Sequence, residues 1–375
     1  MKINDIIDVN FDVVQDIASA GTYEYALLLK NSASNVGTIT VYKEMPLSLA
    51  GSTIADTENV NGITKKEFRT FFENGGVYLA AGNIQSVTDI ITSINNLRTG
   101  KATWYGTTDK VTDAGCIYVV VPSDLVTSDN IKAINNAFPV PNTVRVCTTI
   151  TAAGQLDSDI GKYDVFIKFA NAEDTNAALA FAAYMTNVDL DVTDTIKDYC
   201  YTQESVITPV TTVPEITTYD VNYVDTIGKY VVNVGGNLAN GISADTDFGT
   251  ICVENDVTNA VLTAVMSKIK INESGRTTLI SAITDALQRF IINGFIKQNA
   301  TYTGKNIVIK YGDTAKAYTI LSTGETMQRG YKIYAIPTSD VSIADKAARK
   351  FPPIYVIIMC ELGVRTIKIQ GEVRS

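Results

Sequence analysis

The 375 residues of this chain include no histidine and 40 aspartates and glutamates. Carboxylates are therefore the most numerous side chains that could take part in acid–base or metal chemistry. Without an imidazole there is no Ser-His-Asp or Cys-His catalysis, no histidine-ligated zinc and no usual general base near neutral pH. An enzyme with this sequence would have to work with carboxylates, lysine or tyrosine alone.

The densest group of carboxylates lies in the stretch NVDLDVTDTIKD. It contains Asp189, Asp191, Asp194 and Asp198, a density of oxygen ligands that could attract calcium. The stretch lacks the glycine and the final glutamate that an EF-hand loop requires. An acidic, solvated loop is therefore the favoured interpretation.

Two further patterns also fall short of a site. The glycine-rich stretch 233–241 does not match G-x-G-x-x-G and indicates a turn in which backbone approaches backbone. A carboxylate pair for glycoside hydrolysis has no fixed spacing in sequence, so the sequence does not exclude one. Sugar-binding clefts are usually lined by aromatic side chains, however, and this chain has a single tryptophan, Trp104. A carboxylate-dependent hydrolase stays a less favoured alternative, and we expect no enzyme activity, metal or cofactor.

Composition narrows the class of protein. The chain is 46% hydrophobic and 19% charged, as folded proteins are. Its net charge of -9, with a pI of 4.7, argues against nucleic-acid binding. No apolar run is long enough to cross a membrane, and the N-terminus lacks the features of a signal peptide. Five scattered cysteines suggest a reducing compartment, so we expect synthesis in a cytoplasm.

The first half alternates strands and helices. Continuous apolar runs indicate strands covered on both faces, so we predict an outer α/β part over residues 23–215. Strands are expected at 23–31, 37–44, 76–82, 116–122, 143–150 and 163–170, and helices at 65–76, 86–100, 128–138 and 173–187. The stretch 205–218 holds two prolines and predicts a linker or edge strand, where we place a domain boundary.

The second half predicts a core α+β domain over residues 216–362. A strand region runs to a turn at Gly235–Gly236 and is followed by helices 257–269, capped by Asp256, and 277–292. The apolar faces of both helices should pack on one mixed sheet, built from strands at 306–312, 317–322, 331–337 and 354–362.

The two ends of the chain form extended arms in this prediction, residues 1–22 and residues 363–375. Each alternates apolar and polar residues, the pattern of a half-buried strand. The side chains that share one face are Ile7, Val9, Phe11 and Val13 in the first arm, and Arg365, Ile367, Ile369 and Val373 in the second.

The C-terminal arm allows two interpretations. It could fold back as a hairpin on 354–362 with Gly363 in the turn, or it could complete the sheet edge of a neighbouring copy. Charge favours the second. Residues 1–16 carry one lysine and four aspartates (1 − 4 = -3), whereas residues 364–375 carry three basic residues and one glutamate (3 − 1 = +2). Head-to-tail pairing that does not close on itself generates a helical polymer.

The order of segments resembles the sheath proteins of contractile bacteriophage tails, in particular the family with short subunits. The segments that carry the likeness are the opening INDIIDVNFDV with YEYALLLK, then YVVNVGGNLANG, the two-helix region 247–296, MQRGYKIYAIP, SIADKAARKFPPIYVII and a final strand pair. Residues 23–215 have no segment-by-segment match and are assigned to the outward-facing part.

The resemblance implies a structural role. Sheath subunits build a helical sleeve of stacked rings, here expected to be six-fold, around a tail tube. Their arms add strands to the core-domain sheets of neighbours, with Gly21 and Gly363 as hinges. Contraction then drives the tube through the host envelope. The implied partners are further copies of the chain, the tube protein, and the baseplate and tail terminator proteins. The implied location is the virion tail. The resemblance implies no direct contact with nucleic acid and no insertion into a membrane.

The principal alternative is another structural subunit of a virion or injection machine, such as a tube or capsid protein. Tube subunits are usually shorter and dominated by β-structure, whereas this sequence predicts at least five helices.

Deletion of residues 364–375 tests the arm hypothesis. We expect a soluble, folded monomer that cannot polymerise, because the donated strand is lost. Circular dichroism would establish folding and electron microscopy would establish assembly. Tubular polymers of normal appearance from the truncated chain would refute the hypothesis.

Overall fold

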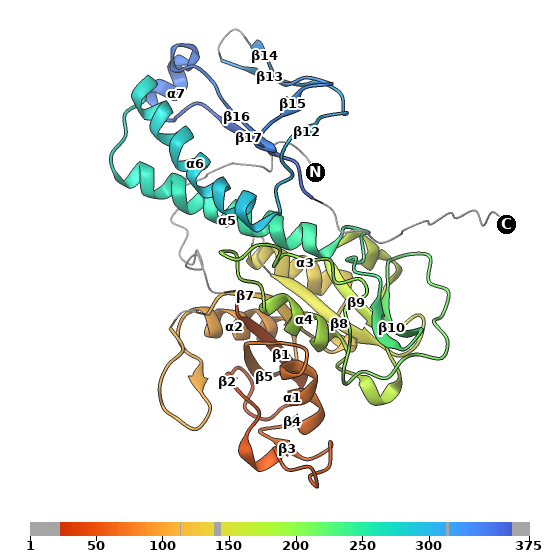
Figure 1. The fold of residues 1–375 in the computed structure, drawn as a ribbon. Helices are drawn as coiled ribbons and strands as arrows, with labels where there is room; N and C mark the ends of the chain where they lie inside the picture. Colours follow the sequence, from red (N-terminus) through yellow and green to blue (C-terminus); the bar gives the residue numbers. More distant parts are fainter. Residues whose placement is uncertain (1–22, 113, 139–143, 313–314, 362–375) are drawn as a thin grey trace, which may run out of the picture.

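The computed structural model describes residues 23–112, 114–138, 144–312 and 315–361 (Figure 1). Both arms lie outside these residues, so their predicted pairing stays a prediction. The predicted interface and hinge residues outside the described part are Ile7, Val9, Phe11, Val13, Gly21, Gly363, Arg365, Ile367, Ile369 and Val373.

A nine-stranded mixed sheet forms the lower body in Figure 1. Its six central strands run parallel, as the continuous apolar segments predict. Strand β11 pairs antiparallel with β10 at one edge, and β2 pairs antiparallel with β5 near the other. In spatial order the strands are β11 (Tyr230–Val234), β10 (Asn222–Ile227), β9 (Val165–Phe169), β8 (Arg145–Ile150), β7 (Cys116–Val120), β1 (Tyr25–Asn31), β5 (Tyr78–Ile84), β2 (Thr40–Tyr42) and β6 (Thr103–Trp104).

Helices cover both faces of this sheet. Alternate residues of β1 enter different cores: Ala26 and Leu28 lie with α1 (Lys65–Phe72) and α4 (Ala178–Thr186), and Leu27 and Leu29 lie with α2 (Val87–Arg98) and α3 (Ser128–Ala137). Side-chain caps begin three of these helices, with Thr64, Ser86 and Thr127 each accepting a backbone N–H. The four helices predicted for this half are confirmed, although α4 begins later than predicted.

The sheet continues past the stretch 205–218, where we expected a domain boundary. Strand β10 pairs with β9 in parallel, and β11 returns antiparallel along it. Whether residues 216–362 fold independently stays a prediction. These first strands of the second half, however, hydrogen-bond to the sheet of the first half.

Two long helices follow, α5 (Ala244–Met266) and α6 (Glu273–Asn293). The predicted cap at Asp256 is wrong, because Asp256 lies in the middle of α5 and the N-cap residue is Ser243. The prediction placed the helix start at the apolar stripe and overlooked the polar first turns. Those turns are helical because Phe248 and Ile251 are buried against the sheet body.

The single sheet predicted beside these helices is also wrong. The remaining strands of the described chain form separate two-stranded ladders, because each pairs with only one neighbour. The pairs are β12 (Ala300–Thr301) with β15 (Thr326–Met327), β13 (Ile307–Tyr311) with β14 (Lys316–Leu321), β16 (Tyr331–Ala335) with β17 (Ile354–Ile358), and β3 (Asn59–Val60) with β4 (Ile63–Thr64) in the first half. The large mixed sheet therefore belongs to the other end of the molecule.

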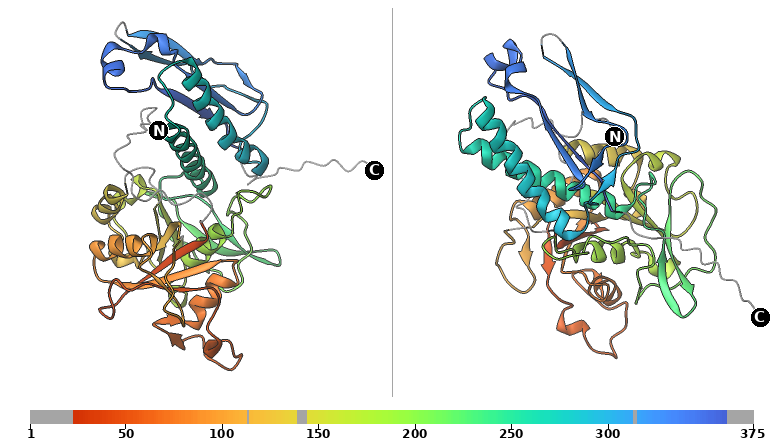
Figure 2. Two further views of the ribbon diagram at one scale, coloured as in Figure 1. Left: turned by 90° about the vertical axis from the view of Figure 1, so that its left-hand side faces the viewer. Right: turned by 45° about the horizontal axis from the view of Figure 1, so that its top comes forward.

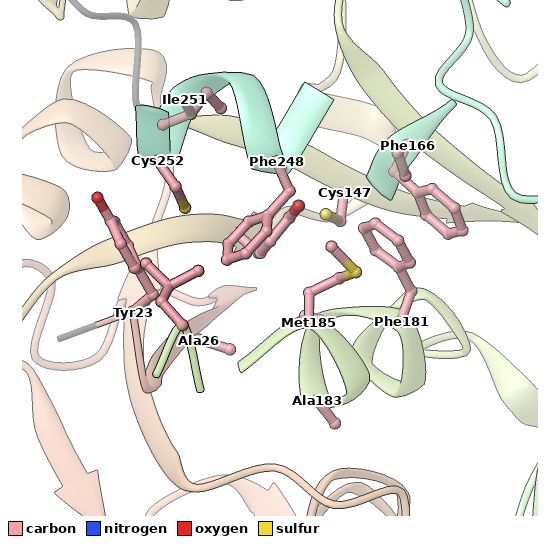
Figure 3. Close-up of a cluster of buried hydrophobic side chains, with 14 of the residues drawn as sticks. Tyr23, Ala26, Cys147, Phe166, Phe181, Ala183, Met185, Phe248, Ile251 and Cys252 are labelled. Atoms are coloured by element: carbon pink, nitrogen blue, oxygen red, sulfur yellow. The ribbon is translucent and has the colours of Figure 1, made fainter. Parts of the chain in front are cut away.

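One hydrophobic core joins the sheet body to the long helices (Figure 3). The fully buried ring of Phe248 on α5 lies 5.7 Å from Tyr23 and 6.2 Å from Tyr118, centroid to centroid. Beyond α5, the same core continues into α6 through Leu279 and Ile283. Figure 2 shows α5 and α6 between the sheet body and the C-terminal hairpins.

A buried ion pair reinforces this joint. Arg145 of β8, 5% exposed, donates Nε at 2.7 Å and Nη2 at 2.8 Å to the two carboxylate oxygens of Asp247 on α5. The two-pronged contact fixes the first turn of α5 against the amino end of β8. Of the described helices, none is long and apolar enough to cross a bilayer.

Removing the guanidinium should destabilise the whole chain. In Arg145→Ala, the carboxylate of Asp247 stays buried without its partner, at a cost of about 3–5 kcal/mol. Urea unfolding followed by fluorescence would measure the shift in midpoint. The control is Arg69→Ala, whose half-exposed pairs with Asp56 and Glu73 should contribute below about 1 kcal/mol. Equal shifts for the two variants would contradict the joint proposed here.

Candidate assembly interface

The hairpin of β16 and β17 has open edges. Each of its strands has one ladder partner in the described chain, so each leaves a row of backbone N–H and C=O groups facing away from the hairpin. Natural edge strands usually carry charges, prolines or a cover that blocks further pairing. Strand β17 has five consecutive large apolar residues, IYVII, and none of these protections.

The inner face of the hairpin packs on the core. Val356 is buried, and Ile333, Ile354 and Ile358 are half-buried against the cluster that contains Phe290 of α6. Cross-strand pairing places Ile333 directly opposite Val356. This face fixes the hairpin to α6.

The outer face is covered only in part, because the ring of Tyr334 lies 6.3 Å from that of Tyr318 on β14 and Lys332 pairs with Glu325. Tyr355 and Ile357 alternate with the inward residues, and Tyr334 and Lys332 stand opposite them on β16. All four are only half-buried, and none belongs to the core clusters. A continuously apolar strand is typical of a sheet covered on both faces, so β17 lacks cover that another chain could supply.

Polar contacts hold the hairpin to the start of α6. Arg276 donates from Nη2 to the carbonyl of Ala335 at 2.9 Å, and Glu273 accepts the backbone N–H of Thr338 at 3.0 Å. The hydroxyl and backbone N–H of Thr338, with Arg276, lower the pKa of Glu273 to about 2. The hairpin is therefore presented on a fixed platform.

A short ladder continues the hairpin at the end of α6. Lys297 donates its backbone N–H to Met359 at 2.7 Å, and Glu361 donates to Phe295 at 2.8 Å. The described chain ends on this ladder, directly before the predicted C-terminal arm.

The polar cluster that most resembles a catalytic group is inaccessible. Lys168 Nζ lies 2.6 Å from Glu204 Oε1, and Tyr199 donates to the same oxygen. The side chains of Lys168 and Glu204 are 0% and 1% exposed, and burial lowers the pKa of Lys168. Substrate cannot reach these groups, so the cluster is a structural contact of β9. Sequence reasoning missed it because one charge in an apolar strand gives no indication of its partner.

The acidic stretch 189–198 forms no metal site in the described residues, where no three histidine, cysteine or carboxylate side chains are placed to hold an ion. Asp191 instead receives Nε of Arg289 at 2.7 Å, and Arg289 also pairs with Asp256. The stretch is fastened to α6 by this arginine. The glycine-rich stretch is the predicted turn: Gly235 has a φ of 96°, and a Cβ there would lie 2.6 Å from Asn222 Oδ1.

Comparison with known proteins identifies this part of the chain. Residues 244–370 match the family described as E217 tail sheath protein gp31-like, C-terminal domain. This segment belongs to the C-terminal domain family of phage tail sheath proteins. The match covers the two long helices and the three hairpins that follow them, so the resemblance to tail sheath proteins is confirmed for this part of the chain. A tail sheath is a structural part of a bacteriophage tail.

The other comparisons add little. The crystal structure of a sheath tail protein from Desulfitobacterium hafniense is similar with a TM-score of 0.44 and 10% identity, covering 84% of this chain and 97% of that chain. Similarity at this level does not by itself establish a common fold. No curated protein matches the sequence.

Two adjacent residues of β17 test the assignment of its faces. Ile357→Asp should leave the fold intact, because this half-buried side chain stands opposite Lys332, but it should abolish assembly. Val356→Asp should unfold the chain, because it buries an unpaired carboxylate. Thermal unfolding and sedimentation would be measured for both. Normal assembly of Ile357→Asp would show that the outer face is not an interface.

Proposed function

We propose that the chain is a structural subunit of a contractile phage tail sheath. It polymerises into a helical sleeve around the tail tube by exchanging terminal strands with neighbouring copies. The family match of residues 244–370 carries the proposal, and the half-covered hairpin of β16 and β17 supports it. No enzyme activity is part of this function.

The hairpin is the proposed receiver of donated strands. Its open edges can accept an extended segment through backbone hydrogen bonds, which tolerate many side-chain combinations. A strand that binds in this way can keep its ladder while the bodies that it links rotate. Gly21 and Gly363 are the proposed hinges for this rotation.

Contraction would use no nucleotide. The energy would come from a difference in buried surface between two packings of one subunit, with the sheet body and the long helices moving together. The shared core and the Arg145–Asp247 pair support such a rigid unit. The proposed partners are the tail tube, baseplate and tail terminator proteins, with the sheath in the virion tail and assembly in the cytoplasm of the bacterial host.

Negative-stain electron microscopy of the purified full-length chain tests the proposal. We expect wide, striated tubes, because a sheath subunit holds the information for its own helical contacts. The control is the chain without residues 364–375, which should remain monomeric. A full-length protein that stays a small soluble particle at every concentration and ionic strength would refute the proposal, as would closed shells.

A further inference from the structure

One edge of the nine-stranded sheet is covered by a segment that lies far from it in sequence. Strand β11 is the last strand on this side of the sheet. Residues 201–204, which we call the edge cover, run antiparallel along the outer side of β11. Three backbone hydrogen bonds join the cover to the strand, and they run from Asn233 to Thr202 at 2.9 Å, from Tyr201 to Asn233 at 2.8 Å and from Glu204 to Val231 at 3.0 Å.

The strand beneath the edge cover would otherwise be able to accept another strand. Its sequence, YVVNV, is mostly apolar and contains neither a charged residue nor a proline. These are the residues that usually protect an edge from further pairing. In this respect β11 resembles β17, so the edge cover hides a second strand to which a donated segment could pair.

The opposite edge of the sheet is covered in a different way, by a local turn. Trp104 of β6 donates its backbone N–H to the carbonyl of Asp109 at 3.1 Å, so the chain folds back directly on its own edge strand. The edge cover of β11 has no such local support. It lies in the irregular stretch 187–221 between α4 and β10, so its position must be fixed by side chains.

A buried ionic contact fixes the edge cover to the sheet. Glu204 is 4% exposed, and its Oε1 lies 2.6 Å from Nζ of Lys168 on β9. The hydroxyl of Tyr199, just before the cover, donates to the same oxygen. The ring of Tyr199 lies 5.0 Å from that of Phe181 on α4, centroid to centroid. The cover is therefore tied to both the sheet and the helix that packs on it.

The ionic contact also selects the register of the cover. Backbone hydrogen bonds form with any side chain, so a slip of two residues along β11 would preserve both the bonds and the buried face. Such a slip would place Thr202 or Val206 where Glu204 now lies. Neither side chain can neutralise Lys168, and a buried ammonium without its partner is strongly unfavourable. Only one register satisfies Lys168.

The pair is not the most stable way to fill this space. Oε2 of Glu204 is buried and has no hydrogen-bond partner in the described chain. Replacing a buried ion pair by apolar side chains of similar volume is often neutral or stabilising, whereas removing one partner is costly. The pair therefore matters more for the choice of register than for the stability of the fold.

We propose that Lys168 and Glu204 are positioning residues that decide which edge receives a donated strand. By holding the edge cover in one register, they keep β11 closed and leave donated strands to the hairpin of β16 and β17. The inference rests on the strand exchange proposed above, because it names the residues that restrict that exchange to one sheet.

Replacing both charges tests this role in the full-length chain. In Lys168→Met with Glu204→Met, the unfolding midpoint in urea should not fall, because no unpaired charge stays buried. Hydrogen–deuterium exchange below the assembly concentration should accelerate at least about tenfold in residues 201–204 and 231–233, and stay unchanged in β7 and β8. Electron microscopy should show irregular aggregates in place of uniform tubes, because donated strands then also pair with β11.

A milder variant and a matched control accompany the double variant. Glu204→Gln keeps the volume and one acceptor for Lys168, so it should fold and accelerate exchange in the same segments by a smaller factor. It decides the question if the double variant does not fold. The control is Gln203→Met with Lys229→Met, which introduces the same residue type at exposed sites on the cover and on the β10–β11 turn. Its exchange and its tubes should match those of the wild type.

The possible results separate this inference from the proposed function. Wild-type exchange rates in the edge cover of the double variant and of Glu204→Gln would overturn the role of the pair. Accelerated exchange together with uniform tubes would overturn the selection between edges. A wild-type chain that forms no tubes would instead overturn the sheath proposal, and the exchange rates alone would then confirm or overturn the hold of the pair on the cover.

Discussion

The burial of one end of α5 against the large sheet is the interaction on which the rest of the structure depends. Phe248 and Ile251 enter the same core as β1, β7 and α4, and Arg145 fixes the first turn through Asp247. The far end of α5 packs along α6, and α6 in turn supports the β16–β17 hairpin. Gly249 permits this arrangement, because a Cβ at this position would lie 2.2 Å from the ring of Phe295. The hairpin is therefore linked to the sheet through the packed helices α5 and α6.

The sheet body and the hairpins at the other end of the molecule differ in how completely their apolar faces are covered. The sheet body has helices on both faces, so its apolar strands are fully covered within one chain. The hairpins at the other end are two-stranded, and an isolated two-stranded ladder is marginally stable in water. Packing on α6 covers one face of the β16–β17 hairpin, and contacts such as Tyr318 with Tyr334 cover part of the other. The hairpin is therefore less completely covered than the central strands of the sheet.

Local patterns predicted most individual elements but not their assembly. Alternation and cap residues located α1, α2 and α3 closely, because Thr64, Ser86 and Thr127 act within one helical turn. The start of α5 was missed because its first turns are helical through contacts with distant strands. The partition of strands between one large sheet and several hairpins was also missed, since short apolar segments do not specify their partners. Glu204 and Asp247 lie 36 and 102 residues from their buried partners, so sequence proximity could not reveal either pair.

By itself, the sequence determined four features of this protein: it has no histidine, it is acidic, its strands and helices alternate in the first half, and its segments follow the order of a tail sheath protein. Only the tertiary structure decided that the first half and the strands beyond residue 218 share one sheet, and that β16 and β17 each have one ladder partner in the described chain. Composition and local propensity act over a few residues. Whether a strand is covered or keeps an open edge depends on which distant segments of the chain come together. That pairing is decided by how the whole chain buries its apolar surface.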